Sequence, residues 1–381
     1  MAKFRDTNPD IGKADSSERF PSIDAMRGML LLLLVANGFG LLKEQMLNQA
    51  QWGWITSQFA HRPWQGCSLW DLLQPGMLFV VGLAMPFSYA NRQAKGQSWP
   101  TQFLHALLRA GLLIALGVYL DSYQKGQLVF ELRGDLQQIG LSYLLAFFVL
   151  PFGMPVHGVT IGFLLIGHTA AYVIYSIAGG HELWSQTQNL GVTIDQMLRL
   201  PVHRENYVTF NVIPATAIVI TGILVAGLIR SGLTAGVKVI IMAGVSFFII
   251  LLAWLPAGAG GWVDFSWTPL IPMIKRLGTF TFVLTSVGWM LLLFAYFYTL
   301  MEGFSLNLLA LPITIVGRNA LFVFVANFLF HGWADRSARL LLPDSPALVF
   351  RLQPLLIELI VVFIFWLLCW WLYHRKIFFK V

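Results

Sequence analysis

His61 and Asp71 are the two residues of this sequence whose types and spacing best suit proton transfer. They lie ten residues apart in the segment HRPWQGCSLWD. A neutral imidazole takes up a proton near neutral pH, and a nearby carboxylate orients or polarises the ring. We therefore consider His61 a candidate general base or nucleophile and Asp71 its partner. The alternative is that His61 is an ordinary loop residue.

Asn37 is a third candidate, because its amide interrupts the apolar run LLLLVANGFG. A side-chain amide can stabilise the oxyanion of an acyl-transfer reaction or position a carbonyl group. It can also simply bond to a neighbouring helix. Its role depends on the elements that carry it.

Those elements are expected to be membrane-spanning helices. Of the 381 residues, 57% are hydrophobic and 11% are charged, whereas soluble proteins carry about 25% charged residues. The apolar runs are about 20 residues long, which is enough to cross a hydrocarbon layer of ~30 Å. This pattern excludes a soluble multidomain enzyme, a disordered chain and a fibrous protein. Cys67 and Cys369 form neither a disulfide framework nor a CxxC metal pair.

The fold class predicted is therefore all-α, a polytopic transmembrane helical bundle of about 10 or 11 spans. A polar cytoplasmic tail is expected over residues 1–20 and a single transmembrane domain over 21–381. Pro312 and the triplet Gly317-Arg318-Asn319 interrupt the ninth run. The predicted spans cover residues 23–42, 69–90, 103–120, 136–152, 156–178, 208–229, 237–256, 280–301, 307–330 and 354–373.

The distribution of Lys and Arg predicts the orientation. The net charge of +7 is spread over short loops, which indicates contact with anionic lipid headgroups rather than with nucleic acid. The bias slightly favours cytoplasmic N- and C-termini. In that orientation one group of polar residues lies at the outer ends of the spans, and we expect a single site there: Asn37, His61, Asp71, Gln137, Lys275 and Asn327.

The cytoplasmic side offers arginines as ligands for an anionic cofactor. Asp24 and Arg27 are three residues apart on one face of the first span, which predicts a local ion pair. Each arginine is alternatively an ordinary positive-inside residue. The candidates are Arg27, Arg109, Arg230 and Arg318.

Several segments resemble motifs of the heparan-α-glucosaminide N-acetyltransferase family, and the chain is similar to a bacterial member. His61, Trp64, Gly66, Asp71, Pro75 and Gly82 match its H-x2-W-x-G-x4-D-x3-P-x6-G pattern. Further similarity lies in RFPSIDAMRG, in the position of Asn37, and in the segments RGDLQQIGLSYLLA, PMIKRLGTFTFVLTSVG and VGRNALFVFVANFLF. The sequence departs from the family at Gln65, Gln138, Ile274 and Gly278.

The resemblance implies a transmembrane N-acetyltransferase of the bacterial inner membrane. It would transfer the acetyl group of cytoplasmic acetyl-CoA to the amine of an amino sugar or glycan outside. His61 would be the base or would carry the acetyl group, Asn37 would bind the oxyanion, and Asp71 would orient His61 or bind the ammonium group. Acceptor binding would involve Trp64, Gln137, Lys275 and Asn327. The four arginines would bind acetyl-CoA, no metal is expected, and a homodimer is suggested.

Two other kinds of function use the same polar residues. A transporter or flippase for a sugar or lipid-linked glycan would use them as a binding site, and should show paired, interrupted helices. A non-catalytic subunit for envelope assembly would need no catalytic geometry. The enzyme hypothesis requires His61 to lie beside Asn37.

Overall fold

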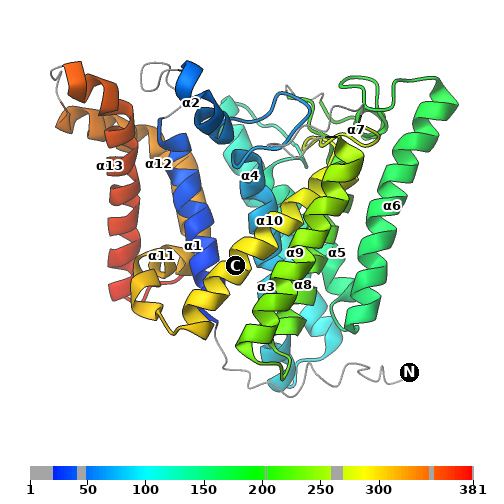
Figure 1. Cartoon of the computed structure of the whole chain (residues 1–381), viewed down its shortest axis with the longest axis horizontal. Helices are drawn as coiled ribbons and strands as arrows, with labels where there is room; N and C mark the ends of the chain where they lie inside the picture. Colours follow the sequence, from blue (N-terminus) through cyan, green and yellow to red (C-terminus); the bar gives the residue numbers. More distant parts are fainter. Residues whose placement is uncertain are drawn as a thin grey trace. The chain divides into compact units, whose positions relative to one another are not determined.

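The computed structural model describes residues 20–40, 49–201, 203, 205–258, 269–342 and 347–379. The predicted cytoplasmic tail, except for Phe20, lies outside these residues. Every regular element in the described part of the chain is helical, which confirms the all-α fold class. The described residues form thirteen α-helices, and Figure 1 labels them. They are α1 (Pro21–Val35), α2 (Gln49–Thr56), α3 (Leu73–Ala94), α4 (Trp99–Lys125), α5 (Asp135–Val149), α6 (Met154–Gly179), α7 (Leu190–Met197), α8 (Val212–Ile229), α9 (Ala235–Ala257), α10 (Phe280–Tyr298), α11 (Asn307–Arg318), α12 (Ala320–Leu341) and α13 (Ala347–His374).

Seven helical segments among the described residues are long and apolar enough to cross a membrane. They correspond to α3, α4, α6, α8, α9, α10 and part of α13, and α11 with α12 makes an eighth if this bent pair is counted as one span. The predicted count of about ten is not confirmed, because in the described part of the chain α1 and α5 each have only 15 residues. Such a helix is ~22 Å long, which is shorter than the hydrocarbon layer. The chain is a polytopic helical bundle with the features of a multi-pass membrane protein.

The first predicted span, residues 23–42, ends earlier than its apolar sequence suggests. Helix α1 stops at Val35, and a short 3-10 turn follows over Asn37–Gly40. Asn37, Gly38 and Phe39 all adopt positive φ, at 44°, 69° and 53°. A left-handed backbone cannot continue a right-handed helix, and Asn and Gly adopt it most readily. Asn37 therefore lies in a turn after the helix.

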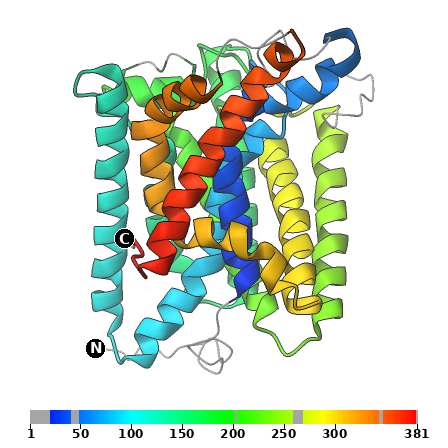
Figure 2. The same ribbon diagram turned by 90° about the vertical axis from the view of Figure 1, so that its left-hand side faces the viewer.

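The ninth predicted span is broken into α11 and α12, which are bent by 67° relative to each other. The break falls at Asn319, within the triplet that interrupts the sequence pattern. Asn319 is buried; its Nδ2 donates to the carbonyl of Ile377 and its Oδ1 accepts from the backbone N–H of Phe379. In Figure 2, α11 runs across the direction of α13. The side chain at the break thus supplies hydrogen bonds to the segment after α13.

The chain divides into two compact units. Within the first unit, α5 packs on α4 and α8, and α8 also packs on α6. Within the second, α11 packs on α1, and α13 packs on both α11 and α12. Of the described residues, the first unit comprises those in Trp64–Gly66 and Gln74–Ala295, and the second comprises those in Phe20–Pro63, Cys67–Leu73 and Tyr296–Val381. A single domain over residues 21–381 stays a prediction.

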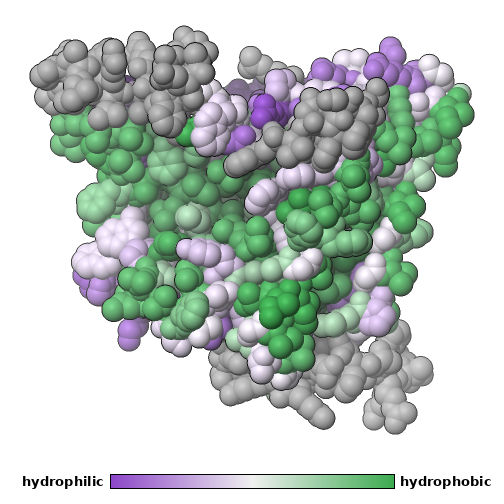
Figure 3. Space-filling model, viewed as in Figure 1, coloured by the Kyte–Doolittle hydropathy of each residue, from purple (hydrophilic) through white to green (hydrophobic). Residues whose placement is uncertain are grey.

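Glycines allow close helix contacts within each unit. A Cβ on Gly28 of α1 would overlap the carbonyl oxygen of Ile313 in α11, and one on Gly82 of α3 would overlap that of Val219 in α8. Small residues of this kind let transmembrane backbones approach closely. The outer faces carry large residues instead of small ones: apolar side chains such as Phe163 and Phe247 are exposed there. Figure 3 shows hydrophobic residues over much of the visible face. These surfaces suit lipid contact.

Candidate active site

His61 and Asp71 form a close pair in the second unit. His61 Nδ1 lies 2.8 Å from Asp71 Oδ1. The imidazole side chain is 44% exposed, whereas the carboxylate is 1% exposed. A carboxylate can only accept a hydrogen bond, so Nδ1 carries the proton. The neutral ring then has its basic lone pair on Nε2, the nitrogen that a base or nucleophile would use.

The Asp71 carboxylate is held by several donors. Its Oδ2 accepts from the backbone N–H groups of Arg62 (3.3 Å) and Ser68 (3.2 Å), and lies 2.9 Å from Ser68 Oγ. The backbone N–H of Asp71 in turn lies 3.3 Å from Ser68 Oγ. This reciprocal arrangement is typical of a capping box, here just before α3. The bonds hold the carboxylate that orients His61.

The loop that follows His61 is fixed at its other end by contacts within the first unit. Gly66 has φ of 106°, and its N–H donates to the carbonyl of Met273. Trp64 Nε1 donates to the carbonyl of Trp184. The Trp64 ring packs on a buried apolar cluster that includes Tyr172. Trp64, predicted to bind the acceptor, therefore also anchors residues 64–66 in the first unit.

Asn37 lies in the 3-10 turn after α1, and its side chain is exposed. Phe39, two residues later, meets Phe59 edge-to-face, with ring centroids 6.0 Å apart. Phe59 in turn lies two residues before His61. The aromatic contact therefore brings the turn of Asn37 and the loop of His61 together in the second unit. No hydrogen bond joins the two side chains among the described residues.

Gln137 and Lys275, both predicted to bind the acceptor, lie in the first unit. Gln137 is buried, and its Nε2 donates to Asp121 Oδ2 at 2.6 Å. Lys275 Nζ lies 6.0 Å from the ring centre of Tyr207, and its backbone carbonyl accepts from Asn211 Nδ2. The position of Gln137 indicates a packing role, whereas Lys275 is partly exposed and accessible to a ligand.

Asn327, the fourth predicted acceptor residue, belongs to a polar cluster between α12 and α13. Its Oδ1 lies 3.2 Å from His331 Nδ1. His331 Nε2 lies 3.9 Å from Glu358 Oε2, and Glu358 is buried. The i, i+4 spacing of Asn327 and His331 places both side chains on one face of α12. Ionisable groups at such positions commonly pair with one another.

The four arginines fall into two pairs, one in each unit. Arg27 forms the predicted ion pair with Asp24 at 3.4 Å, and Arg318 Nε lies 3.9 Å from the same carboxylate. The Arg318 guanidinium also lies over the ring of Tyr373. In the first unit, the other two guanidiniums lie over aromatic rings, Arg109 over Tyr143 and Arg230 over Phe87. Two of the four candidate arginines, Arg27 and Arg318, therefore lie beside Asp24.

Sequence reasoning missed two features. Ser68 could have been found, since Ser68-x-x-Asp71 before an apolar run is a capping-box pattern. The second feature is a buried ion pair in the first unit, which the sequence pattern does not reveal, because Arg133 in the loop before α5 meets Asp195 of α7 at 3.2 Å. Burial lowers the pKa of the neighbouring His203, while Glu131 acts in the opposite direction.

Among the described residues, no group of three His, Cys, Asp or Glu side chains is placed to hold a metal ion.

Comparison with known proteins gives a limited match. No protein-family model matches the chain. The chain is 27% identical over 143 residues to heparan-alpha-glucosaminide N-acetyltransferase of Mus musculus and 28% identical over 144 residues to that of Homo sapiens. Each match covers 36% of this chain and spans about a fifth (20%) of the relative's length. These similarities support a distant relationship between the chain and that family.

Proposed function

We propose that this chain is a membrane acyltransferase. It transfers an acetyl group from acetyl-CoA on the cytoplasmic side to the amine of an amino sugar or glycan on the other side. The observation that carries the proposal is the His61–Asp71 pair, an exposed imidazole oriented by a buried carboxylate. The distant relatives, named as N-acetyltransferases, support the reaction class.

In the direct route, His61 Nε2 takes a proton from the acceptor amine as the amine nitrogen attacks the thioester carbonyl carbon. A carbon–nitrogen bond forms and the carbon–sulfur bond breaks. The leaving thiolate takes the proton from His61 and departs as free CoA. In the two-step route, Nε2 attacks the thioester carbon, the carbon–sulfur bond breaks and CoA leaves as the thiolate. The amine then attacks the acetyl carbon, the carbon–Nε2 bond breaks, and the proton lost by the amine goes to the thiolate. The tautomer that the contact with Asp71 favours suits both routes.

The surroundings of His61 favour separate roles for its two partners. Asp71 is almost wholly buried and bound by three neighbouring donors, so we assign it to orienting His61 rather than to binding the acceptor's ammonium group. The exposed amide of Asn37 would donate to the oxyanion that forms during attack. The contact between Phe39 and Phe59 supports this assignment.

The donor would be bound at the N-terminal end of α1. Arg27 and Arg318 share Asp24 there, and guanidinium groups bind phosphates strongly. The loop of His61 follows the opposite end of α1, so the acetyl group would have to pass along the second unit. Arg109 and Arg230 are alternative phosphate ligands. Trp64, Lys275 and Asn327 remain proposed acceptor residues, whereas we assign Gln137 to packing against Asp121. The proposed location is the bacterial inner membrane with both termini cytoplasmic.

The test is acetyl transfer by the purified full-length chain from labelled acetyl-CoA to a panel of amino sugars, with His61→Ala as the comparison. We expect transfer by the wild-type chain, and loss of transfer with retained acetyl-CoA binding in the variant. If both proteins bind acetyl-CoA and neither transfers or hydrolyses it, the proposal fails. His105→Ala is a matched control, because this exposed histidine of α4 has no part in the proposed site.

Transport of a sugar or lipid-linked glycan is the second candidate. The observation that favours it is the 67° break between α11 and α12, since interrupted helices build transporter binding sites. Proteoliposomes without acetyl-CoA provide the test. Movement of a labelled glycan across the bilayer that survives His61→Ala would favour transport over transfer.

A further inference from the structure

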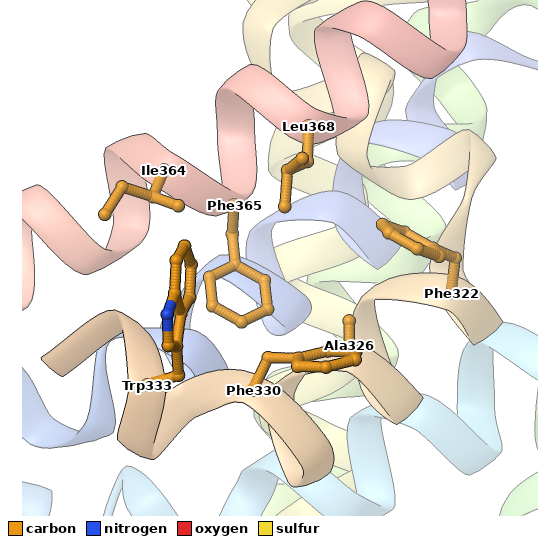
Figure 4. Close-up of a pocket in the computed structure, with 7 residues that line it drawn as sticks. All are labelled: Phe322, Ala326, Phe330, Trp333, Ile364, Phe365 and Leu368. Carbon is orange, nitrogen blue, oxygen red and sulfur yellow. The ribbon is translucent and has the colours of Figure 1, made fainter. Parts of the chain in front are cut away.

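An apolar groove runs between α12 and α13 in the second unit (Figure 4). Its volume is about 460 Å³, within the range of about 300–1,000 Å³ that is typical of ligand pockets. Every residue that lines it is apolar. Helix α12 contributes Phe322, Ala326, Phe330 and Trp333, and α13 contributes Ile364, Phe365 and Leu368.

The groove has a buried floor and exposed walls. Ala326 and Phe365 are 3% and 2% exposed, whereas Phe330 and Trp333 are 54% and 56% exposed. Figure 4 shows Trp333 beside Ile364 at one end, with Phe322 at the other. The stretch of α12 from Phe322 to Trp333 is ~16 Å long. A long, open and wholly apolar trough suits an extended hydrocarbon chain better than a compact polar ligand.

A cation continues the same face of α12 beyond the groove. Arg336 follows Trp333 by three residues, a spacing that keeps both on one face about 4.5 Å apart along the axis. Arg336 is exposed, and no ion pair of its side chain is found within the described part of the chain. By contrast, Arg339 is bound through two nitrogens to Asp335. Arg336 is therefore the arginine that can serve a ligand here.

The order of these groups matches an anionic lipid. Tryptophan side chains are enriched where the hydrocarbon layer meets the headgroups, and Trp333 lies between the apolar groove and Arg336. Arginine binds phosphate oxygens in a fixed fork geometry. We propose that this groove binds one acyl chain of an anionic membrane phospholipid, with its phosphate at Arg336. This lipid site is separate from the proposed acyl transfer and does not depend on it.

Photo-crosslinking of the full-length chain in bilayer nanodiscs tests the site. The probe is phosphatidylglycerol that carries a diazirine in one acyl chain. We expect labelled positions to concentrate in residues 322–333 and 364–368, and unlabelled phosphatidylglycerol to compete better than phosphatidylcholine. Soluble glycerol phosphate should not compete. Labelling spread evenly over the exposed faces of α6 and α9, or equal competition by phosphatidylcholine, would overturn the proposal.

Variants test the two parts of the site separately. Ala326→Phe fills the floor and should abolish labelling in the groove. Phe330→Gln, at an exposed wall, provides a second variant should Ala326→Phe fail to fold. Arg336→Gln should weaken competition by phosphatidylglycerol about fivefold, the effect of one cation near an anionic membrane surface. Arg375→Gln, at an exposed arginine after the far end of α13, is the matched control and should leave competition unchanged.

Two outcomes of the variant series would contradict the lipid site. Equal losses for Arg336→Gln and Arg375→Gln would mean that net charge alone attracts the lipid. A groove without label, combined with a dimer that Ala326→Phe converts to a monomer, would mean that a second copy of the chain covers it. The mass of the protein in nanodiscs, measured for each variant, distinguishes this outcome from lipid binding.

Discussion

His61 illustrates how one residue acquires a chemical role from its neighbours. Its sequence position, in a loop before an apolar run, is compatible with an ordinary surface histidine. The hydrogen bond to Asp71 selects the tautomer, and the capping box with Ser68 holds the carboxylate that makes this bond. The same histidine without these contacts would rotate freely and sample both tautomers.

Replacing Asp71 tests this dependence. In Asp71→Asn the amide can donate to Nδ1, which moves the ring proton to Nε2 and removes the basic nitrogen. We expect the rate of acetyl transfer to fall by a factor of ~10²–10⁴, as at other oriented histidines. Single-turnover transfer gives the rate, and ¹⁵N NMR of labelled histidine gives the tautomer. Asp335→Asn, at an exposed ion pair, should change neither, and an unchanged rate in Asp71→Asn would contradict the proposed mechanism.

His203 predicts a dependence of stability on pH. Burial lowers the pKa of His203 in the folded protein from its ordinary value of about 6.5. The unfolded chain therefore binds a proton at His203 more readily than the folded chain does. The buried neutral imidazole makes its full contribution to stability above about pH 6.5, and this contribution is lost as the pH falls through the lowered pKa. Melting temperatures measured from pH 8 to pH 5 should fall less steeply for His203→Gln than for the wild-type chain. Parallel curves would show that other groups control the acid sensitivity.

At the scale of elements, the helix ends depend on residues that change the backbone locally. Asn37 and Gly38 end α1 because they adopt positive φ, and Asn319 marks the break between α11 and α12. The break was foreseeable from the Gly-Arg-Asn triplet. The early end of α1 was not, because an apolar run does not reveal which residue will turn.

The close contact between α1 and α11 depends on the absence of a side chain at Gly28. In Gly28→Ala the added methyl group would overlap the carbonyl of Ile313 and push the helices apart. We expect a loss of about 1–3 kcal/mol in the free energy of unfolding. Gly111→Ala in α4 is the matched control, since a Cβ there meets no neighbouring atom, and it should stabilise the helix by roughly 0.5–1 kcal/mol. Denaturation in detergent would measure both, and equal effects would rule out a close-contact role for Gly28.

At the scale of the whole molecule, the arrangement of spans predicts which loops face each side. Ser185 lies in the segment between α6 and α7, and Ser231 lies between α8 and α9, beyond opposite ends of α8. With a cytoplasmic N-terminus, a membrane-impermeant maleimide should label Ser185→Cys in intact cells and Ser231→Cys only after the membrane is opened. Cys67→Ser and Cys369→Ala remove the background. The reverse pattern would invert the predicted orientation.

The sequence by itself determined the fold class and the main catalytic candidates. Long apolar runs require helices in lipid because backbone groups must be satisfied within the segment, and His61, Asp71 and Asn37 stand out by residue type and spacing. The tertiary structure decided which polar groups meet. Asp24 lies between Arg27 and Arg318, Gln137 turns to Asp121, and Asn37 occupies a turn beside the loop of His61. Hydrophobicity is a property of each segment alone, whereas such contacts join segments far apart in the chain and form only when the helices pack.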